Sequence, residues 1–279
     1  MTTSINTNAA ALQSLQNLNA TASQLTKTQS EISTGLKVGS ATDNGAIWAI
    51  AQNERSNILG LDQVTDSLNR AISTVDVAVS AGQSISDLLN QMKAKALAAT
   101  DTSLNTTSIA ALNNDFVALR NQISQLVSNA DFNGANMIKT SGTAVMALAN
   151  SSGTSHLTVA AVNLGLGGGT VTITASGTFS TNATASVQLA LVNSSITNVN
   201  AAVAKLGTGA NALQTQLSFI GQLQDTLTTG VGNLVDADVA KESAQLTALQ
   251  TKQQLGVQAL SIANQAPQYL LSLFSGSSS

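Results

Sequence analysis

The chain has little of what catalysis, nucleic-acid binding or membrane binding requires. Cysteine is absent from its 279 residues, which excludes disulfides and thiolate chemistry. Charged residues make up 9% and the net charge is −3, which leaves no basic patch for nucleic acid or an anionic membrane. No apolar run approaches the ~20 residues that span a bilayer. We expect neither partner, and the scarcity of charge indicates that much of the surface lies against other protein.

Catalytic and cofactor-binding motifs are also missing. His156 is the single histidine, and no His/Cys/Asp/Glu cluster has metal-ligand spacing. The glycine-rich run at 165–169 lacks the Lys-Ser/Thr pair of a phosphate loop. Asp236, Asp238 and Glu242 could suggest a cation site, but capping a helix N-terminus is favoured because carboxylates complement the helix dipole. We predict no enzyme activity, no cofactor and no metal.

Both ends of the chain carry a strong helical pattern. Aromatic residues reach only 3% and proline occurs once, at Pro267, which permits long uninterrupted helices. The first stripe contains Ala11, Leu15, Leu18, Ala22, Leu25, Gln29, Ile32 and Leu36. The last contains Val239, Glu242, Leu246, Leu249, Gln253, Gly256, Leu260 and Ala263. Such a 3.5-residue repeat is typical of a coiled-coil seam, so we predict that the two ends form helices that pair with each other.

Three further helices are predicted between the ends. One spans about 46–99, with Leu61, Leu68, Val75, Gly82, Leu89 and Ala96 seven residues apart. Thr42 or Asp43 is its expected N-cap. A second follows a loop at 100–103 and carries Ile109, Leu112, Phe116, Leu119, Ile123 and Leu126. The third keeps a four-three alternation from Ala185 to Leu234.

The middle of the chain has a different character. Residues 132–134 form a tight-turn signal that indicates a hairpin. From about 140 to 182, Gly, Ser and Thr dominate, and short alternating runs at 157–159 and 171–174 indicate strands. We expect a small insertion that hangs off the end of the helical bundle.

A slip in the apolar phase between Val235 and Val239 marks a break in the last helical region. The predicted fold is mainly α: nested antiparallel coiled-coil layers from both chain ends, with a short β hairpin and a small β-rich insertion. We assign 1–40 and 236–279 to terminal helices, 41–140 and 183–235 to an inner bundle with its hairpin, and 141–182 to the surface-exposed insertion.

The terminal layer looks too weak to be stable alone. Each buried Leu or Ile contributes roughly 1.5–3 kcal/mol, whereas ordering costs about 1.5 kcal/mol per residue. With half the stripe positions Ala or polar, the balance lies near zero. A second apolar stripe contains Ala248, Leu255, Ala259, Ile262, Ala266, Tyr269 and Leu273. We hypothesise that the ends fold when neighbouring copies cover these faces.

The three arginines, Arg55, Arg70 and Arg120, are expected to pair with carboxylates such as Glu54, Asp66 or Asp115. The pairing is expected within the bundle or across subunits, and the sequence leaves the partners open. The first six residues lack the charged and apolar regions of a cleavable signal. The chain is therefore expected to be cytoplasmic or exported without a cleaved signal peptide.

Short motifs near both ends resemble those of bacterial flagellins, the subunits of the flagellar filament. They are Ile-Asn-Thr-Asn at 5–8, Ile-Ser-Thr-Gly-Leu at 32–36, Ser-Ala-Thr-Asp-Asn at 40–44, Asn-Arg-Ala-Ile-Ser at 69–73, Asp-Phe-Asn-Gly at 131–134, Asn-Leu-Val-Asp-Ala-Asp-Val-Ala-Lys-Glu-Ser at 233–243 and Gln-Leu-Gly-Val-Gln-Ala-Leu-Ser-Ile-Ala-Asn-Gln at 254–265. The similarity covers roughly 1–140 and 185–275 and leaves only the insertion unassigned.

The resemblance implies a secreted structural protein that self-assembles into the extracellular filament for motility. Its partners would be identical or sibling flagellin subunits, the flagellar type III export apparatus, a chaperone and the cap protein. Unfolded export by that apparatus agrees with the absence of a cleavable signal. The implied self-assembly contacts, within and between subunits, are Leu15, Leu18, Leu25, Ile32, Leu246, Leu249, Leu255, Leu260 and Ile262.

Two alternatives remain at this point. A hook–filament junction or cap protein would share the terminal helices but would not polymerise indefinitely. An enzymatic flagellin would need a metal or nucleophile cluster in the insertion, and the sequence contains none.

Overall fold

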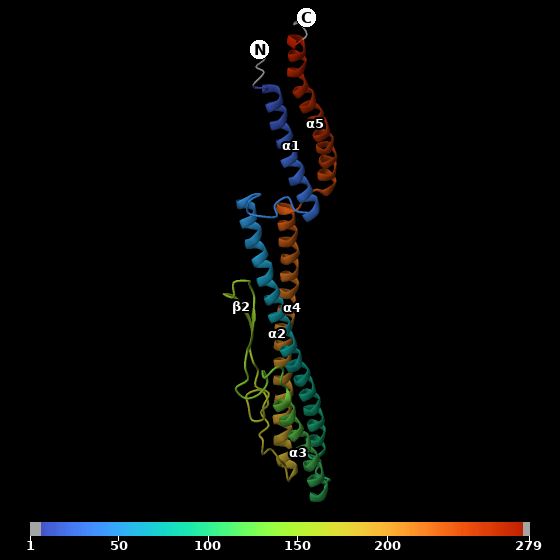
Figure 1. Cartoon of the computed structure of the whole chain (residues 1–279). Helices are drawn as coiled ribbons and strands as arrows, with labels where there is room; N and C mark the ends of the chain where they lie inside the picture. Colours follow the sequence, from blue (N-terminus) through green and yellow to red (C-terminus); the bar gives the residue numbers. More distant parts are fainter. Residues whose placement is uncertain (1–6, 276–279) are drawn as a thin grey trace. The chain divides into compact units, whose positions relative to one another are not determined.

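The computed structural model describes the backbone of residues 7–275 and the side chains of residues 7–265. This part of the chain is mainly helical, with one small sheet (Figure 1). The elements are α1 (Ala9–Thr34), α2 (Gly45–Ala98), α3 (Thr106–Asn129), β1 (Val145–Leu148), β2 (His156–Val159), α4 (Asn182–Val235) and α5 (Val239–Ser275). The predicted fold class is confirmed, and the break between α4 and α5 falls where the apolar phase slips.

Internal contacts divide the chain into two units, each described by itself. The terminal unit comprises 1–55 and 227–279, and the central unit comprises 56–226. The long helices α2 and α4, of 54 residues each, contribute to both. The predicted three-part division stays a prediction. No helix in the described residues has an apolar stretch long enough to cross a bilayer.

The core of the central unit follows the seven-residue repeat read from the sequence. The positions of this repeat that are buried include Leu61, Leu68, Val75, Gly82, Leu89 and Ala96 in α2, Ile109, Phe116 and Ile123 in α3, and Ala185, Val192, Val199, Leu206, Leu213 and Ile220 in α4. Gly82 permits close approach of α2 and α4, since a Cβ there would lie 2.6 Å from Cγ2 of Val203. The predicted helical stripes are therefore the core of this unit.

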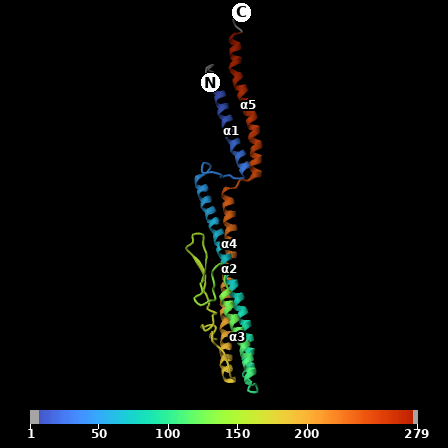
Figure 2. The same ribbon diagram turned by 60° about the horizontal axis from the view of Figure 1, so that its bottom comes forward.

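The insertion lies along the helices of the central unit, beside α2 and α4 (Figures 1 and 2). The amide of Leu148 donates to Oγ of Ser67 in α2 at 3.1 Å, and Nε2 of Gln216 in α4 donates to the carbonyl of Ala149 at 3.3 Å. The ring of Phe179 meets Phe116 of α3 edge to face, with centroids 5.3 Å apart. The expectation that the insertion hangs off the end of the bundle is wrong, because its apolar side chains are buried along the helix faces.

The sheet of the insertion has two antiparallel strands, in which Val145 pairs with Val159 and Leu148 pairs with His156. The strand predicted at 171–174 does not form. Instead, the amide of Thr172 donates to Oγ of Ser195 at 3.0 Å and its hydroxyl donates to a backbone carbonyl of α4. Because α4 satisfies these polar groups, the segment needs no partner strand.

The predicted tight turn is present between Phe132 and Ala135. Each of these residues donates its amide to the carbonyl of the other at 3.0 Å. Asn133 (φ 51°) and Gly134 (φ 81°) both have positive φ, which a two-residue hairpin turn of type I′ requires. The Asp-Phe-Asn-Gly sequence therefore forms a tight turn, closed by two hydrogen bonds, after α3.

Candidate assembly interface

The terminal unit is built on α1 and α5, which lie side by side (Figures 1 and 2). The two helices run antiparallel. At one end, Nδ2 of Asn8 donates to the carbonyl of Ala263 at 2.6 Å, and at the other, Leu36 and Asp236 form an isolated bridge. The prediction that the two chain ends pair with each other is confirmed.

Backbone hydrogen bonds join the chain after α1 to the chain before α5. Gly35 ends α1 in the left-handed conformation (φ 70°), and its carbonyl accepts from the amide of Ala237 at 2.9 Å. The amides of Lys37 and Val38 both donate to the carbonyl of Val235, at 2.7 and 3.2 Å. Val38 is buried. This joint fixes where the terminal helical pair begins.

The loop before α2 is held by two neighbouring side chains. Asp43 accepts hydrogen bonds from the Ser40 hydroxyl, the Ser40 amide and the Gly39 amide, and these donors lower the pKa of its carboxyl. Asn44 caps α2, since its Oδ1 accepts from the amide of Ile47 at 3.1 Å. The N-cap predicted at Thr42 or Asp43 is therefore wrong, because Asp43 is occupied in closing the loop.

The seam between α1 and α5 is thin. Among the described side chains of these two helices, only Thr28 and Leu249 are buried, at 2% and 4% exposure. The half-buried seam positions that the stripes predicted are Ala11, Leu18, Ala22, Leu25 and Ile32 in α1 and Glu242, Leu246, Gln253, Gly256, Leu260 and Ala263 in α5. Little apolar surface of the α1–α5 pair is thus fully removed from water within a single copy of the chain.

Small hydroxyl residues also lie on the buried face of α1, for which the apolar stripe predicted larger side chains. Gln29 is exposed, whereas Ser14, Thr21 and Thr28 are at least half-buried. The hydroxyls of Ser14 and Thr21 donate to the carbonyls four residues earlier in their own helix, at 2.8 and 2.9 Å. Apolar periodicity missed these residues because a hydroxyl bonded to its own backbone packs without leaving an unpaired donor.

Large apolar side chains remain on the outside of the pair. The exposed ones are Leu12 (58%), Leu15 (43%), Val239 (49%), Leu255 (59%), Val257 (54%) and Ile262 (69%). Leu255, Ala259 and Ile262 follow a four-three spacing and form one face of α5, called here the α5 ridge. Ala266, Tyr269 and Leu273, which would continue this stripe, lie outside the described side chains. Sequence reasoning missed Leu12 and Val257, whose positions fall outside both stripes.

The structure separates the nine predicted assembly residues into two groups. Leu18, Leu25, Ile32, Leu246, Leu249 and Leu260 lie on the seam within one chain. Leu15, Leu255 and Ile262 are exposed and available to a second copy. Their role in assembly stays a prediction.

An open groove of about 360 Å³ lies between α1 and the later part of α5, called here the terminal groove. Its lining consists of Thr7, Asn8, Ala11, Leu12, Leu15, Leu260 and Asn264. Three leucines supply apolar surface to this lining, and two asparagines supply polar groups. A groove of this composition suits aliphatic side chains from another helix.

A carboxyl group weakens the seam near the joint. Burial raises the pKa of Glu31, and the nearby carboxylate of Glu242 raises it further. Nζ of Lys27, 3.8 Å from Oε1 of Glu31, acts in the opposite direction. Oε2 of Glu242 is buried and has no hydrogen-bond partner among the described residues. Two acids therefore meet in a seam that has little apolar burial to offset them.

The residues that the sequence analysis weighed as possible metal ligands or catalytic groups have structural roles or lie exposed. His156 is exposed at the start of β2. Oδ1 of Asp238 accepts from the amides of Ala240 and Lys241, both at 3.1 Å, so the predicted capping of the last helix is confirmed. Within the described residues, no three His, Cys, Asp or Glu side chains come together as a metal site.

Comparisons with known proteins match nearly the whole chain. Residues 5–143 match the family model of the bacterial flagellin N-terminal helical region, and residues 189–274 match that of the C-terminal helical region. Flagellin FljM and Flagellin FljK of Caulobacter vibrioides are 54% and 53% identical, each over 97% of this chain and 98% of the relative. A flagellin of Brucella melitensis is 36% identical over 98% of this chain and 99% of its own length.

Proposed function

Because this chain belongs to the bacterial flagellin family, it is a non-enzymatic structural subunit of the flagellar filament, and we propose that its α1–α5 pair folds on assembly to form the contacts between subunits. The single observation that carries the proposal is that most large apolar side chains of that pair are exposed or half-buried rather than buried between the two helices. Only Leu249 among its large described apolar side chains is buried, whereas six are exposed. A helical pair with this distribution gains its stability from neighbours rather than from its own seam.

Two different patches make the proposed contact. The α5 ridge of one copy docks into the terminal groove of the next, so that Leu255 and Ile262 cover Leu12 and Leu15. Since the two patches differ, the contact is heterologous and does not close on itself. Repetition of such a contact gives an open helical polymer, which is the geometry a filament needs.

The proposal also covers the remaining partners of the protein and its route out of the cell. As a flagellin the protein is a component of the filament outside the cell. Five of its relatives, 43–54% identical, come from one strain of Caulobacter vibrioides, which supports co-assembly of sibling subunits. In the proposal, export is by the flagellar type III apparatus, without a cleaved signal peptide, and a chaperone and the cap protein assist. The terminal helices, the inner bundle and the insertion act as three layers with the boundaries given above.

Seeded polymerisation tests the proposal. The full chain should elongate short filament seeds continuously, and a chain that ends at residue 238 should not. Thermal unfolding of the central unit, followed by circular dichroism, should be the same in both chains, which shows that the truncation acts on assembly. Elongation by the truncated chain at the rate of the full chain would overturn the proposal, and so would failure of the full chain to elongate.

A further inference from the structure

Arg70 differs from the other two arginines in the described part of the chain, because its side chain makes no hydrogen bond or ion pair there. Arg120 is buried and donates to the carbonyl of Gly177 at 2.7 Å, and Arg55 donates to Gln52 at 3.2 Å. The carboxylate of Asp115 is taken by Lys95, whose Nζ lies 2.8 Å from Oδ2 of Asp115. Within the described residues, Arg70 and Arg120 form no ion pair with Asp66 or Asp115, and the guanidinium of Arg70 is left over in a chain with few charges.

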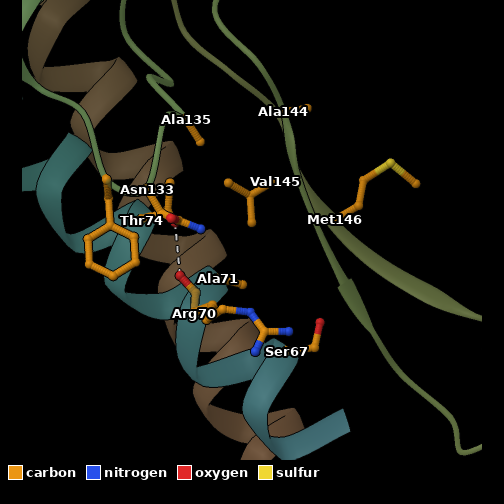
Figure 3. A pocket seen from close by; sticks show the side chains of 10 residues that line it. Ser67, Arg70, Ala71, Thr74, Asn133, Ala135, Ala144, Val145 and Met146 are labelled. Carbon is orange, nitrogen blue, oxygen red and sulfur yellow. Dashed lines mark hydrogen bonds between the residues drawn. The ribbon is translucent and has the colours of Figure 1, made fainter. Parts of the chain in front are cut away.

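The Arg70 side chain lines a pocket of about 280 Å³ between α2, the type I′ turn and the segment leading into β1. Figure 3 shows Arg70 directed along α2 toward Ser67, with Val145 and Met146 across from it. The lining residues are Ser67, Arg70, Ala71, Thr74, Phe132, Asn133, Ala135, Ala144, Val145 and Met146. The pocket thus combines one guanidinium, several small polar groups and an apolar wall.

The walls of this pocket are fixed. The turn is closed by its two cross-strand hydrogen bonds, and Oδ1 of Asp131 accepts from the amide of Gly134 at 3.1 Å. The segment beyond it is tied to α2 by the bond from Leu148 to Ser67. A preformed site loses little entropy when it binds. Its volume lies just below the roughly 300–1,000 Å³ of small-molecule sites, so it suits a protruding side chain better than a cofactor.

We infer that this pocket binds a carboxylate of a second copy in the filament, and that Asp101 at the α2–α3 turn of that copy supplies it. The inference rests on the filament function and adds a contact made by the central unit. A guanidinium prefers a carboxylate, with which it forms paired, charge-assisted hydrogen bonds. No acidic residue occurs between Asp131 and Asp225, so the insertion of the second copy cannot supply the carboxylate.

Asp101 fits better than the other acids in three ways. It lies in the turn at the end of the bundle, where it protrudes, whereas Asp66 and Asp76 lie on the flanks of α2. Oδ1 of Asp101 accepts from the Ser103 amide at 2.8 Å, which holds its carboxylate in place at the turn. Leu97, 54% exposed and one helical turn earlier, supplies an apolar side chain for the wall near Met146.

The spacing along α2 allows the contact. From Arg70 to the helix end at Ala98 is 28 residues, or about 42 Å at 1.5 Å per residue, and the turn adds a few ångströms. A copy displaced by this distance along the helix axis would place its turn at the pocket. Turn and pocket are different patches, so this contact is also heterologous and continues indefinitely.

Charge reversal in the full-length chain tests the inference, with elongation of wild-type seeds measured by sedimentation and electron microscopy. Arg70→Glu and Asp101→Arg should each raise the critical concentration about tenfold or more, because each places like charges together. The double variant should return to within about threefold of the wild type, since coupling is the signature of a direct pair. Arg70→Glu combined with Asp76→Arg is the matched control and should not be rescued.

Three outcomes would overturn the inference: single variants that elongate like the wild type, a double variant no better than the two effects combined, or equal rescue by Asp76→Arg. Thermal unfolding of each monomer shows that the variants fold, and Arg70→Gln, which removes the charge without reversing it, should give an intermediate defect. If these variants refute the Arg70–Asp101 contact, the wild-type chain still elongates and the filament function stands. Failure of the wild type to elongate would instead count against the filament function itself.

Discussion

Substitution of Leu255 by alanine separates the roles of the two faces of α5. The Leu255 side chain is 59% exposed in a single chain, so most of its burial must come from a neighbour. Full burial of a leucine contributes about 1.5–3 kcal/mol, and the exposed share corresponds to about 1–2 kcal/mol for each added subunit. Since 1.4 kcal/mol is a factor of ten, the critical concentration for elongation should rise about 5- to 30-fold.

The assay compares elongation and monomer stability in the same variants. Leu255→Ala should leave thermal unfolding of the monomer unchanged, because an exposed side chain contributes within about 0.5 kcal/mol. Leu255→Met keeps the apolar surface and should elongate nearly as the wild type does. Leu249→Ala, at the buried seam position, should impair elongation more strongly, because truncating a buried leucine costs about 2–5 kcal/mol.

The reasoning would be refuted by a Leu255→Ala chain that elongates at the wild-type critical concentration. It would also fail if that substitution lowered the melting temperature of the monomer by several degrees. The first result would mean that no neighbour covers the α5 ridge. The second would mean that the ridge is already packed within one chain.

Two further predictions concern packing and charge. Gly209→Ala should destabilise the central unit by about 1–3 kcal/mol, because a Cβ there would lie 2.6 Å from Cγ1 of the stiff side chain of Val159. Gly207 lies two residues earlier in the same helix, and a Cβ there would meet no atom within 4 Å, so Gly207→Ala should stabilise the central unit by up to about 1 kcal/mol. Thermal unfolding of both variants tests this difference, and equal melting temperatures would contradict it. Because the pKa of Glu31 is raised above its ordinary value of 4.5, its contribution to terminal pairing is fully present below pH 4.5 and is lost as pH rises through the raised pKa. Glu242→Gln removes one cause of the raised pKa of Glu31, so it should lower the critical concentration for elongation at neutral pH and make that concentration less dependent on pH. An unchanged pH profile of the critical concentration would contradict this.

The helical layers were predictable because large apolar side chains mark them. In α4, the positions from Ala185 to Ile220 at intervals of seven are buried as expected, and those four residues after each, such as Leu189 and Val203, are half-buried. A repeat of this length fixes the phase of a helix whatever its partner is. The phase slip after Val235 likewise located the break before α5.

Features that depend on polar groups were harder to predict. Thr28 is the most buried side chain of α1, although the stripe passes through Leu25 and Ile32 on either side of it. The cap of α2 is Asn44 rather than Asp43, because only the folded loop shows which side chain is already engaged. Such choices between hydrogen-bond partners are made by tertiary structure and leave no periodic signal.

Long-range placement was also beyond the sequence. Alternation at 171–174 indicated a strand, but α4 supplies the partners of Thr172 in its place. The pocket around Arg70 joins α2 to residues more than sixty positions later in the chain. The sequence around Arg70 does not show that its side chain lacks a partner within the described residues. It also does not show that the turn at 132–135 lies across the pocket from it.

Amide hydrogen exchange tests the central claim most directly when it is measured in parallel on the dilute monomer and on filaments. Folding on assembly predicts that α1 and α5 exchange rapidly in the monomer and slowly in the filament, whereas α2, α3 and α4 in the central unit are protected in both. Strong protection of α1 and α5 in the dilute monomer would contradict the claim, because the helical pair would then be stable without a neighbour.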